Sequence, residues 1–194
     1  MYSELNFKNK TVLITGGASG FGFELVKLFL SDGAKVIFTT REKSSAEKAV
    51  IEIPEMNQKN VMYYTVDLSN KAEIDKFLIS IDKDFPSGID VLVNNAASII
   101  VGRFEKFSYD DLISTFNVNL VSSYMLSHHV IRKMKEKKNG VIINIISTNF
   151  SGSRYFFALR VNNDRFSLIS YNRLIYYNFI NIIHCWKFKH SFQQ

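Results

Sequence analysis

The sequence predicts an α/β fold in which a doubly wound parallel sheet lies between two layers of helices, a three-layer α/β/α arrangement. The first observation is that five apolar runs alternate with helix-forming segments over residues 1–149. Continuous apolar runs are typical of strands that a parallel sheet buries on both faces. The second observation is a glycine-rich turn, TGGASGFG at residues 15–22, between the first apolar run and the first helical segment. Right-handed crossovers then favour a ligand site beyond the carboxyl ends of the strands.

Each predicted strand is a short apolar stretch bounded by turn residues. The strands are expected at residues 11–14, 35–39, 61–66, 89–93 and 141–146. The first helix is expected at residues 21–30 and is stopped by Ser31-Asp32-Gly33. Its apolar face at helical spacing consists of Phe21, Leu25, Leu28 and Phe29.

The other predicted helices begin and end at recognisable signals. A Ser-x-x-Glu capping box at residues 44–47 starts the second helix, and Pro54 ends it. Ser69-Asn70 opens the third helix, which runs to about Phe85 before a Pro-Ser-Gly break. Ser108 caps a long helix over residues 109–137, with Asn139-Gly140 as its stop.

Composition favours a cytoplasmic protein. The 194 residues can enclose one sizeable core. The single cysteine, Cys185, excludes an internal disulfide framework and fits a reducing compartment. The sequence has neither the apolar core of a signal peptide nor the roughly 18 apolar residues of a membrane span.

The net charge of +6 divides the chain into two parts. Residues 1–149 are nearly balanced, whereas residues 150–194 carry six Lys or Arg against one acid and 12 of the 27 aromatic residues. We therefore expect a nucleotide-binding domain at residues 1–149 and an atypical basic aromatic tail at residues 150–194. A nucleic-acid surface on the tail is disfavoured, because the apolar run at residues 174–186 would sooner pack or aggregate.

The glycine-rich turn indicates nucleotide binding. Glycines at positions 16, 20 and 22 permit close backbone approach, and the N-terminus of the following helix favours an anion such as pyrophosphate. The spacing is G-x-x-x-G-x-G rather than the G-x-G-x-x-G dinucleotide fingerprint.

Five motifs in order resemble those of the short-chain dehydrogenases/reductases. They are TGGASGFG, Asp67-Leu68, Asn94-Asn95-Ala96, Asn117-Val118-Asn119 and Asn144-Ile145-Ile146-Ser147. The resemblance covers about residues 7–149. It implies a Rossmann-like NAD(P)-binding domain that lacks the last strands of the family fold. It also implies an oxidoreductase that transfers hydride between nicotinamide and an alcohol or ketone carbon.

The resemblance also implies the cofactor-binding residues. Those of the pyrophosphate turn are Gly16, Ser19, Gly20, Phe21 and Gly22. Asp67 would lie beside the adenine with the Leu68 backbone, although an Asp after a strand is also a common helix cap. Asn94 would tie neighbouring strands, and Ala96 would lie against the ribose, with Ala97 where the family has glycine.

The end of the second strand bears on the choice of cofactor. Thr40 stands where NAD-preferring relatives carry an acid, and the guanidinium of Arg41 can pair with a 2′-phosphate. NADP is therefore preferred and NAD is the alternative, with Arg41 then a solvated surface residue.

Two catalytic residues follow from the resemblance. Ser147 would orient the substrate carbonyl, and the carbonyl of Asn119 would hold a water of the proton relay; without the resemblance, the first would be a turn residue and the second a helix cap or a solvated residue. No metal site is expected, since the adjacent His128 and His129 point in different directions on a helix.

The family reaction also needs Tyr-x-x-x-Lys about a dozen residues after the serine, and no tyrosine of this sequence is followed by lysine four positions later. We therefore expect little or no turnover from this chain. A truncated sequence that leaves the family near residues 147–151, through read-through or an alternative exon, is the simplest interpretation, and a divergent end is the other.

Two further function classes stay open: a noncatalytic nucleotide-binding sensor or scaffold, and a misfolding product.

The family forms homodimers or homotetramers through the long helix, and this assembly is doubtful for this chain. Its substrate, a small alcohol or carbonyl compound, cannot be identified from the sequence. Nucleic acid is not expected as a partner, and no membrane span is expected, although an amphipathic contact with a membrane surface stays open.

Overall fold

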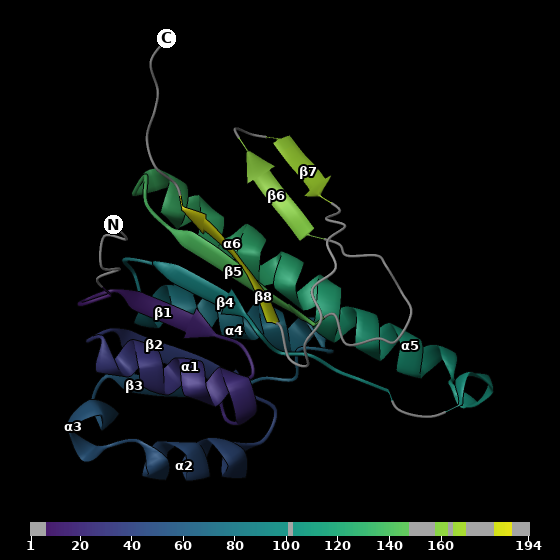
Figure 1. The fold of residues 1–194 in the computed structure, drawn as a ribbon, viewed down its shortest axis with the longest axis horizontal. Helices are drawn as coiled ribbons and strands as arrows, with labels where there is room; N and C mark the ends of the chain where they lie inside the picture. Colours follow the sequence, from purple (N-terminus) through teal and green to yellow (C-terminus); the bar gives the residue numbers. More distant parts are fainter. Residues whose placement is uncertain (1–6, 101–102, 148–157, 163–164, 170–180, 188–194) are drawn as a thin grey trace.

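The computed structural model describes residues 7–100, 103–147, 158–162, 165–169 and 181–187. Five parallel strands form the sheet in the order β3-β2-β1-β4-β5, with β8 added antiparallel beside β5 (Figure 1). The parallel strands are β1 Thr11–Ile14, β2 Lys35–Thr40, β3 Val61–Thr65, β4 Val91–Asn94 and β5 Val141–Ser147. This confirms the predicted doubly wound sheet, with strand ends that shift by one or two residues.

The basic tail contributes the remaining strands. β8, Asn181–Lys187, pairs with the whole length of β5, from Val141 opposite Lys187 to Ser147 opposite Asn181. A separate two-stranded sheet joins β6, Ala158–Asn162, to β7, Arg165–Ile169.

Helices cover both faces of the sheet. On one face, α1 (Gly20–Ser31) and α2 (Lys43–Glu52) pack over β1 and β2. On the other, α4 (Lys71–Asp84) and α6 (Ser122–Glu136) pack over the same strands and β4. The shorter elements are α3 Glu55–Gln58, the 3-10 turn η1 Phe104–Lys106, α5 Tyr109–Phe116 and the π-helical segment η2 Asn117–Val121.

The core follows from the alternation of side chains along each strand. Val12 and Ile14 of β1 face α1 and α2, whereas Leu13 between them faces α4 and α6. All three are fully buried. Because both faces are covered, the strands are apolar at successive positions, which is the pattern that made the parallel sheet predictable.

The predicted apolar face of the first helix was partly wrong. Phe21 and Leu28 are 40% and 56% exposed, although Phe29 is buried as expected. The sheet-facing stripe consists of Phe23, Val26, Phe29 and Leu30. The stripe begins at Phe23 because Phe21 still belongs to the exposed end of the glycine turn.

The capping box predicted at Ser44 was also wrong. α2 begins one residue earlier, at Lys43, with Glu42 as its N-cap and no side-chain capping bond. By contrast, Ser108 caps α5 as predicted and forms a full capping box with Asp111, which lowers the pKa of Asp111 through the bonds from Ser108.

The long helix is interrupted, because a π-helical segment separates α5 from α6. Its end at Glu136 lies within one residue of the predicted end, and the left-handed residue after α6 is Lys138, with φ of 53°. Gly140 serves packing instead, because a Cβ there would lie 2.3 Å from the Met134 Cγ.

Within the described part of the chain, no helix combines the length and apolar character needed to cross a membrane.

Candidate functional site

The glycine-rich turn between β1 and α1 has the shape of a cradle. Gly16 and Gly20 have φ of +66° and +53°, in the left-handed region that favours glycine. Gly22 is required by close approach, since a Cβ there would lie 2.2 Å from the Gly16 carbonyl oxygen. A Cβ built on Gly20 meets no heavy atom within 4 Å, so the surface above Gly20 is open.

This open surface coincides with the N-terminus of α1. Ser19 is the N-cap residue and forms no side-chain capping bond. Ser19, Gly20 and Phe21 are all exposed. The first N–H groups of a helix lack intrahelical partners and carry partial positive charge. The residues therefore fit a dinucleotide pyrophosphate at this position.

Thr15 and Asn95 fix the turn to the end of β4. The Thr15 hydroxyl oxygen accepts hydrogen bonds from the backbone N–H groups of Asn95 and Ala96, both at 2.9 Å. The Asn95 amide donates to the carbonyl oxygens of Thr15, at 3.0 Å, and Gly16, at 3.2 Å. Sequence reasoning assigned no role to either side chain, although the paired asparagines at 94 and 95 were the available signal.

Asn94 links the ends of β4 and β5, as expected. Its amide donates to Asn144 Oδ1 at 2.8 Å and to Ser127 Oγ of α6 at 3.1 Å. Because Asn94 is only 4% exposed, it acts on the site from inside the sheet. Its own Oδ1 is buried and has no hydrogen-bond partner among the described residues.

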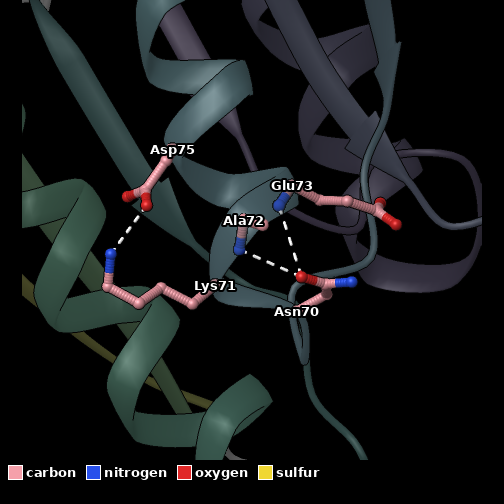
Figure 2. A network of polar contacts seen from close by, with 5 residues as sticks. All are labelled: Asn70, Lys71, Ala72, Glu73 and Asp75. Atoms are coloured by element: carbon pink, nitrogen blue, oxygen red, sulfur yellow. Dashed lines mark hydrogen bonds and ion pairs between the residues drawn. The ribbon is translucent and has the colours of Figure 1, made fainter.

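Asp67 lies in the β3–α4 loop, where its Oδ1 accepts from the Ser69 backbone N–H at 2.8 Å and the Ser69 hydroxyl at 2.7 Å. The alternative that Asp67 caps the next helix is wrong. Figure 2 shows that the cap is Asn70, which accepts from the N–H groups of Ala72 and Glu73. Leu68 is buried in the core on the α4 side.

Arg41 directly follows β2, with its side chain exposed. It forms no ion pair with the described residues. Thr40 and Thr65 are paired in register at the carboxyl ends of β2 and β3. An exposed guanidinium therefore lies beside two hydroxyl-bearing residues at this edge of the sheet.

Asn119 lies in η2 and pairs with the backbone of Ser98, beyond β4. Its Oδ1 accepts from the Ser98 N–H at 2.7 Å, and its Nδ2 donates to the Ser98 carbonyl at 2.9 Å. The side-chain amide is thus engaged on both sides.

Ser147 is the last residue of β5, and its side chain lies outside the described part.

The predicted site residues gather at one edge of the sheet. β1, β4 and β5 are neighbours in the sheet (Figure 1). The turn after β1, Asn94 at the end of β4 and Ser147 at the end of β5 therefore lie at adjacent strand ends. Arg41 and Asp67 follow β2 and β3, farther along the same edge. Asn119 reaches this edge from η2 through Ser98.

The two histidines have separate partners. His129 Nε2 lies 3.2 Å from Asp82 Oδ1, and the His128 ring stacks on Tyr124. In the described ranges, no three His, Cys, Asp or Glu side chains are grouped to hold a metal ion.

Two aromatic residues of α5, Tyr109 and Phe116, lie on the surface, with 75% and 51% of their area exposed. They continue along η2 and α6 into further exposed apolar residues, among them Leu120 and Tyr124.

Comparison with known proteins agrees with this geometry. Residues 10–158 match the family described as short chain dehydrogenase. A 3-oxoacyl-(acyl-carrier-protein) reductase from Chlamydia trachomatis is 34% identical over 143 residues, which cover 72% of this chain and 56% of that protein. A D-beta-hydroxybutyrate dehydrogenase from Cupriavidus necator is 35% identical over 141 residues, with coverages of 72% and 54%.

Solved structures give the same result. A short chain dehydrogenase from Bacillus anthracis superposes with a TM-score of 0.64 at 34% identity, covering 72% of this chain and 57% of that one. The chain thus spans little more than half the length of these relatives.

Proposed function

Because the chain belongs to the short-chain dehydrogenase family, we propose that it binds a nicotinamide adenine dinucleotide along the carboxyl edge of its sheet and prefers NADP. The observation that carries the proposal is the open surface above Gly20 at the N-terminus of α1. A backbone without side-chain obstruction, next to free N–H groups, suits a pyrophosphate.

The remaining contacts are those that the family resemblance implies, and the order of strand ends is compatible with them. The pyrophosphate would lie against residues 16–22, the ribose near Ala96, and the adenine near Asp67 and the Leu68 backbone. Thr15 and Asn95 support this arrangement, because they hold the turn after β1 against the loop after β4.

Arg41 supports the preference for NADP. It is exposed, follows β2 directly and has no acid paired with it among the described residues. A guanidinium binds a phosphate with two parallel hydrogen bonds, whereas NAD offers only a ribose hydroxyl at the same place.

For catalysis, the bound nicotinamide supplies or accepts a hydride. Ser147 orients the substrate carbonyl from the end of β5. Both polar atoms of the Asn119 side chain are hydrogen-bonded to Ser98. The main-chain carbonyl of Asn119 would therefore bind the water of the proton relay. A tyrosine assisted by lysine would donate the proton, and the sequence contains no Tyr-x-x-x-Lys. General acid catalysis contributes about a hundredfold or more, so this chain turns over slowly or not at all.

Ketone reduction by the purified chain tests this account. NADPH oxidation is followed across a panel of small ketones in a preparation whose NADPH binding has been measured first. The expected result is no oxidation above the blank. Turnover of about one per second or faster, which is ordinary for enzymes, would overturn the proposed loss of activity.

The missing tyrosine and lysine favour a second candidate, a noncatalytic nucleotide-binding sensor or scaffold. A dinucleotide-binding fold can serve either role, since function depends on the site rather than on the fold. NADPH affinity that persists without any turnover on the ketone panel would support it.

The exposed apolar residues of α5, η2 and α6 support self-association of the family type through this helix, with Leu112, Phe116, Leu120 and Tyr124 on its surface. A cytoplasmic location and a small alcohol or carbonyl substrate complete the proposal.

A further inference from the structure

Two asparagines of η2 hold two different loops of the nucleotide-binding edge. Asn117 Nδ2 donates to the Ser69 carbonyl of the β3–α4 loop at 3.0 Å. Asn119 pairs with Ser98 of the segment after β4. Residues two positions apart on a helix face different directions, and Val118 between them packs against the core. One turn of helix therefore anchors both loops.

A buried serine supports this turn. Ser122 is 2% exposed, and its hydroxyl donates to the Val118 carbonyl at 2.7 Å. Its backbone N–H donates to the Asn117 carbonyl, five residues back. A hydroxyl that bonds the carbonyl four residues back often bends a helix, and π-helical turns often occur at functional sites. These two bonds of Ser122 hold the backbone turn that carries Asn117.

The loop that Asn117 anchors carries the carboxylate of Asp67. Asp67 Oδ1 accepts from both the backbone N–H and the hydroxyl of Ser69, and the Asn70 N–H donates to the Asp67 carbonyl at 3.0 Å. Asp67 and Ser69 therefore move as one unit. Two side chains attach this unit to the helices: Glu73 of α4, whose Oε2 accepts from the Asp67 backbone N–H at 2.7 Å, and Asn117 of η2, which holds the Ser69 carbonyl. Asp67 Oδ2 forms no hydrogen bond with the described residues, so it is open to a donor such as the exocyclic amine of adenine.

We propose that Asn117 is a positioning residue for the adenine end of the nucleotide site, acting through Ser69 on the direction of the Asp67 carboxylate. The inference rests on the proposed dinucleotide binding. Without the Asn117 amide, the bonds between Asp67 and Ser69 remain, but the loop loses its attachment to η2. The carboxylate then samples more directions, and adenine recognition weakens while pyrophosphate binding does not.

The test compares Asn117→Ala with Asn119→Ala in the full chain. The two variants remove the same side chain from the same turn but release different loops, so each is the matched control of the other. The probes are adenosine 5′-monophosphate, inorganic pyrophosphate and NADPH. Hydrogen exchange of the Ser69, Asn70 and Ser98 amides gives a readout that needs no nucleotide.

For Asn117→Ala we expect adenosine 5′-monophosphate to bind about fivefold to tenfold more weakly, the change typical of one lost hydrogen bond. Pyrophosphate affinity should change less than about twofold, on the same scale. Exchange should rise at Ser69 and Asn70 in this variant and at Ser98 in Asn119→Ala. If Asn117→Ala fails to fold, Asn117→Asp replaces it in the test. This variant keeps the side-chain volume but places a carboxylate against the Ser69 carbonyl, so it should weaken nucleotide binding. Asn117→Gln, which keeps an amide donor, should recover part of the affinity.

The outcomes separate the two proposals. Wild-type chain that binds neither NADPH nor adenosine 5′-monophosphate contradicts the proposed function, and the cofactor role of Asn117 with it. Wild-type binding with unchanged affinity in Asn117→Ala, or equal losses for pyrophosphate and the nucleotide, overturns the positioning role alone.

Discussion

Asn95 and Thr15, 80 positions apart in the sequence, are joined by hydrogen bonds between backbone and side chain in both directions. The Asn95 backbone N–H donates to the Thr15 hydroxyl at 2.9 Å, and the Asn95 amide donates to the Thr15 carbonyl at 3.0 Å. The same amide reaches the Gly16 carbonyl at 3.2 Å. The shape of the glycine turn therefore depends on a residue of β4's carboxyl end as well as on its own glycines.

Asn95→Ala should loosen this turn. The change leaves two carbonyl oxygens of a half-buried turn without their donor, which costs about 1–3 kcal/mol of unfolding free energy. Urea denaturation measures the loss, and NADPH affinity should fall with it. Asn139→Ala, at an exposed position after α6, is the control and should change stability by less than about 0.5 kcal/mol. Equal stability of the two variants would refute the role of Asn95.

Gly20→Ala should separate binding from folding. The added methyl meets no protein atom within 4 Å but points into the surface assigned to the pyrophosphate. We expect a stability cost of about 1–2 kcal/mol from the left-handed backbone and a loss in NADPH affinity of at least about tenfold.

Gly22→Ala should lower stability more than Gly20→Ala does, because its methyl group meets the protein rather than the open surface. Its Cβ would lie 2.2 Å from the Gly16 oxygen and 2.5 Å from the Asn95 Nδ2, so the backbone has to shift. Thermal unfolding should show a larger destabilisation than in Gly20→Ala, of about 3 kcal/mol or more. A Gly22→Ala protein as stable as Gly20→Ala would contradict the observed packing.

The fold was predictable because periodicity and turn chemistry agree along residues 11–147. The site was predictable in part. Glycines at 16, 20 and 22 are recognisable by spacing, whereas the partners of Thr15, Asn95 and Asn117 come from distant strands and loops. The prediction of the buried face of α1 was partly wrong, because the helix has many apolar residues and helical spacing alone does not identify which of them face the sheet. After α6 the left-handed residue is Lys138, whereas Gly140 is packed against Met134, and neither feature is marked by the helix-stop signal at Asn139-Gly140.

Arg41→Ala should reduce NADPH affinity and leave NADH affinity within about twofold. One charge-assisted phosphate contact corresponds to about 1.5–3 kcal/mol, or about tenfold to a hundredfold in affinity. Thr40→Asp should act in the same direction on NADPH and improve NADH binding, since an acid there accepts from the ribose hydroxyl. Equal losses for both nucleotides in Arg41→Ala would show that Arg41 does not read the 2′-phosphate.

Asp82 should make stability depend on pH in the acid range. Burial alone would raise the pKa of Asp82, but the hydrogen bond from Lys133 and the charge of His129 lower it below its ordinary value. Since the folded state binds the proton more weakly, this stabilisation is present above the unfolded pKa of about 3.9 and is lost as pH falls through the folded pKa.

Urea denaturation between pH 6 and pH 3 checks this expectation. Wild-type chain should lose more stability over this range than Asp82→Asn. Asp75→Asn, which removes an exposed ion pair with Lys71 (Figure 2), should retain the steep wild-type loss. If wild type and Asp82→Asn lose stability in parallel as pH falls, the charge of Asp82 beside His129 and Lys133 of α6 contributes nothing to stability.

Titration of the purified 194-residue chain with NADPH and NADH, followed by the fluorescence of the nucleotides, tests the central claim most directly. The account predicts saturable binding that is tighter for NADPH than for NADH and that Gly20→Ala weakens while the protein stays folded. No saturation by either nucleotide up to millimolar concentration, or equal binding by folded Gly20→Ala, would contradict it.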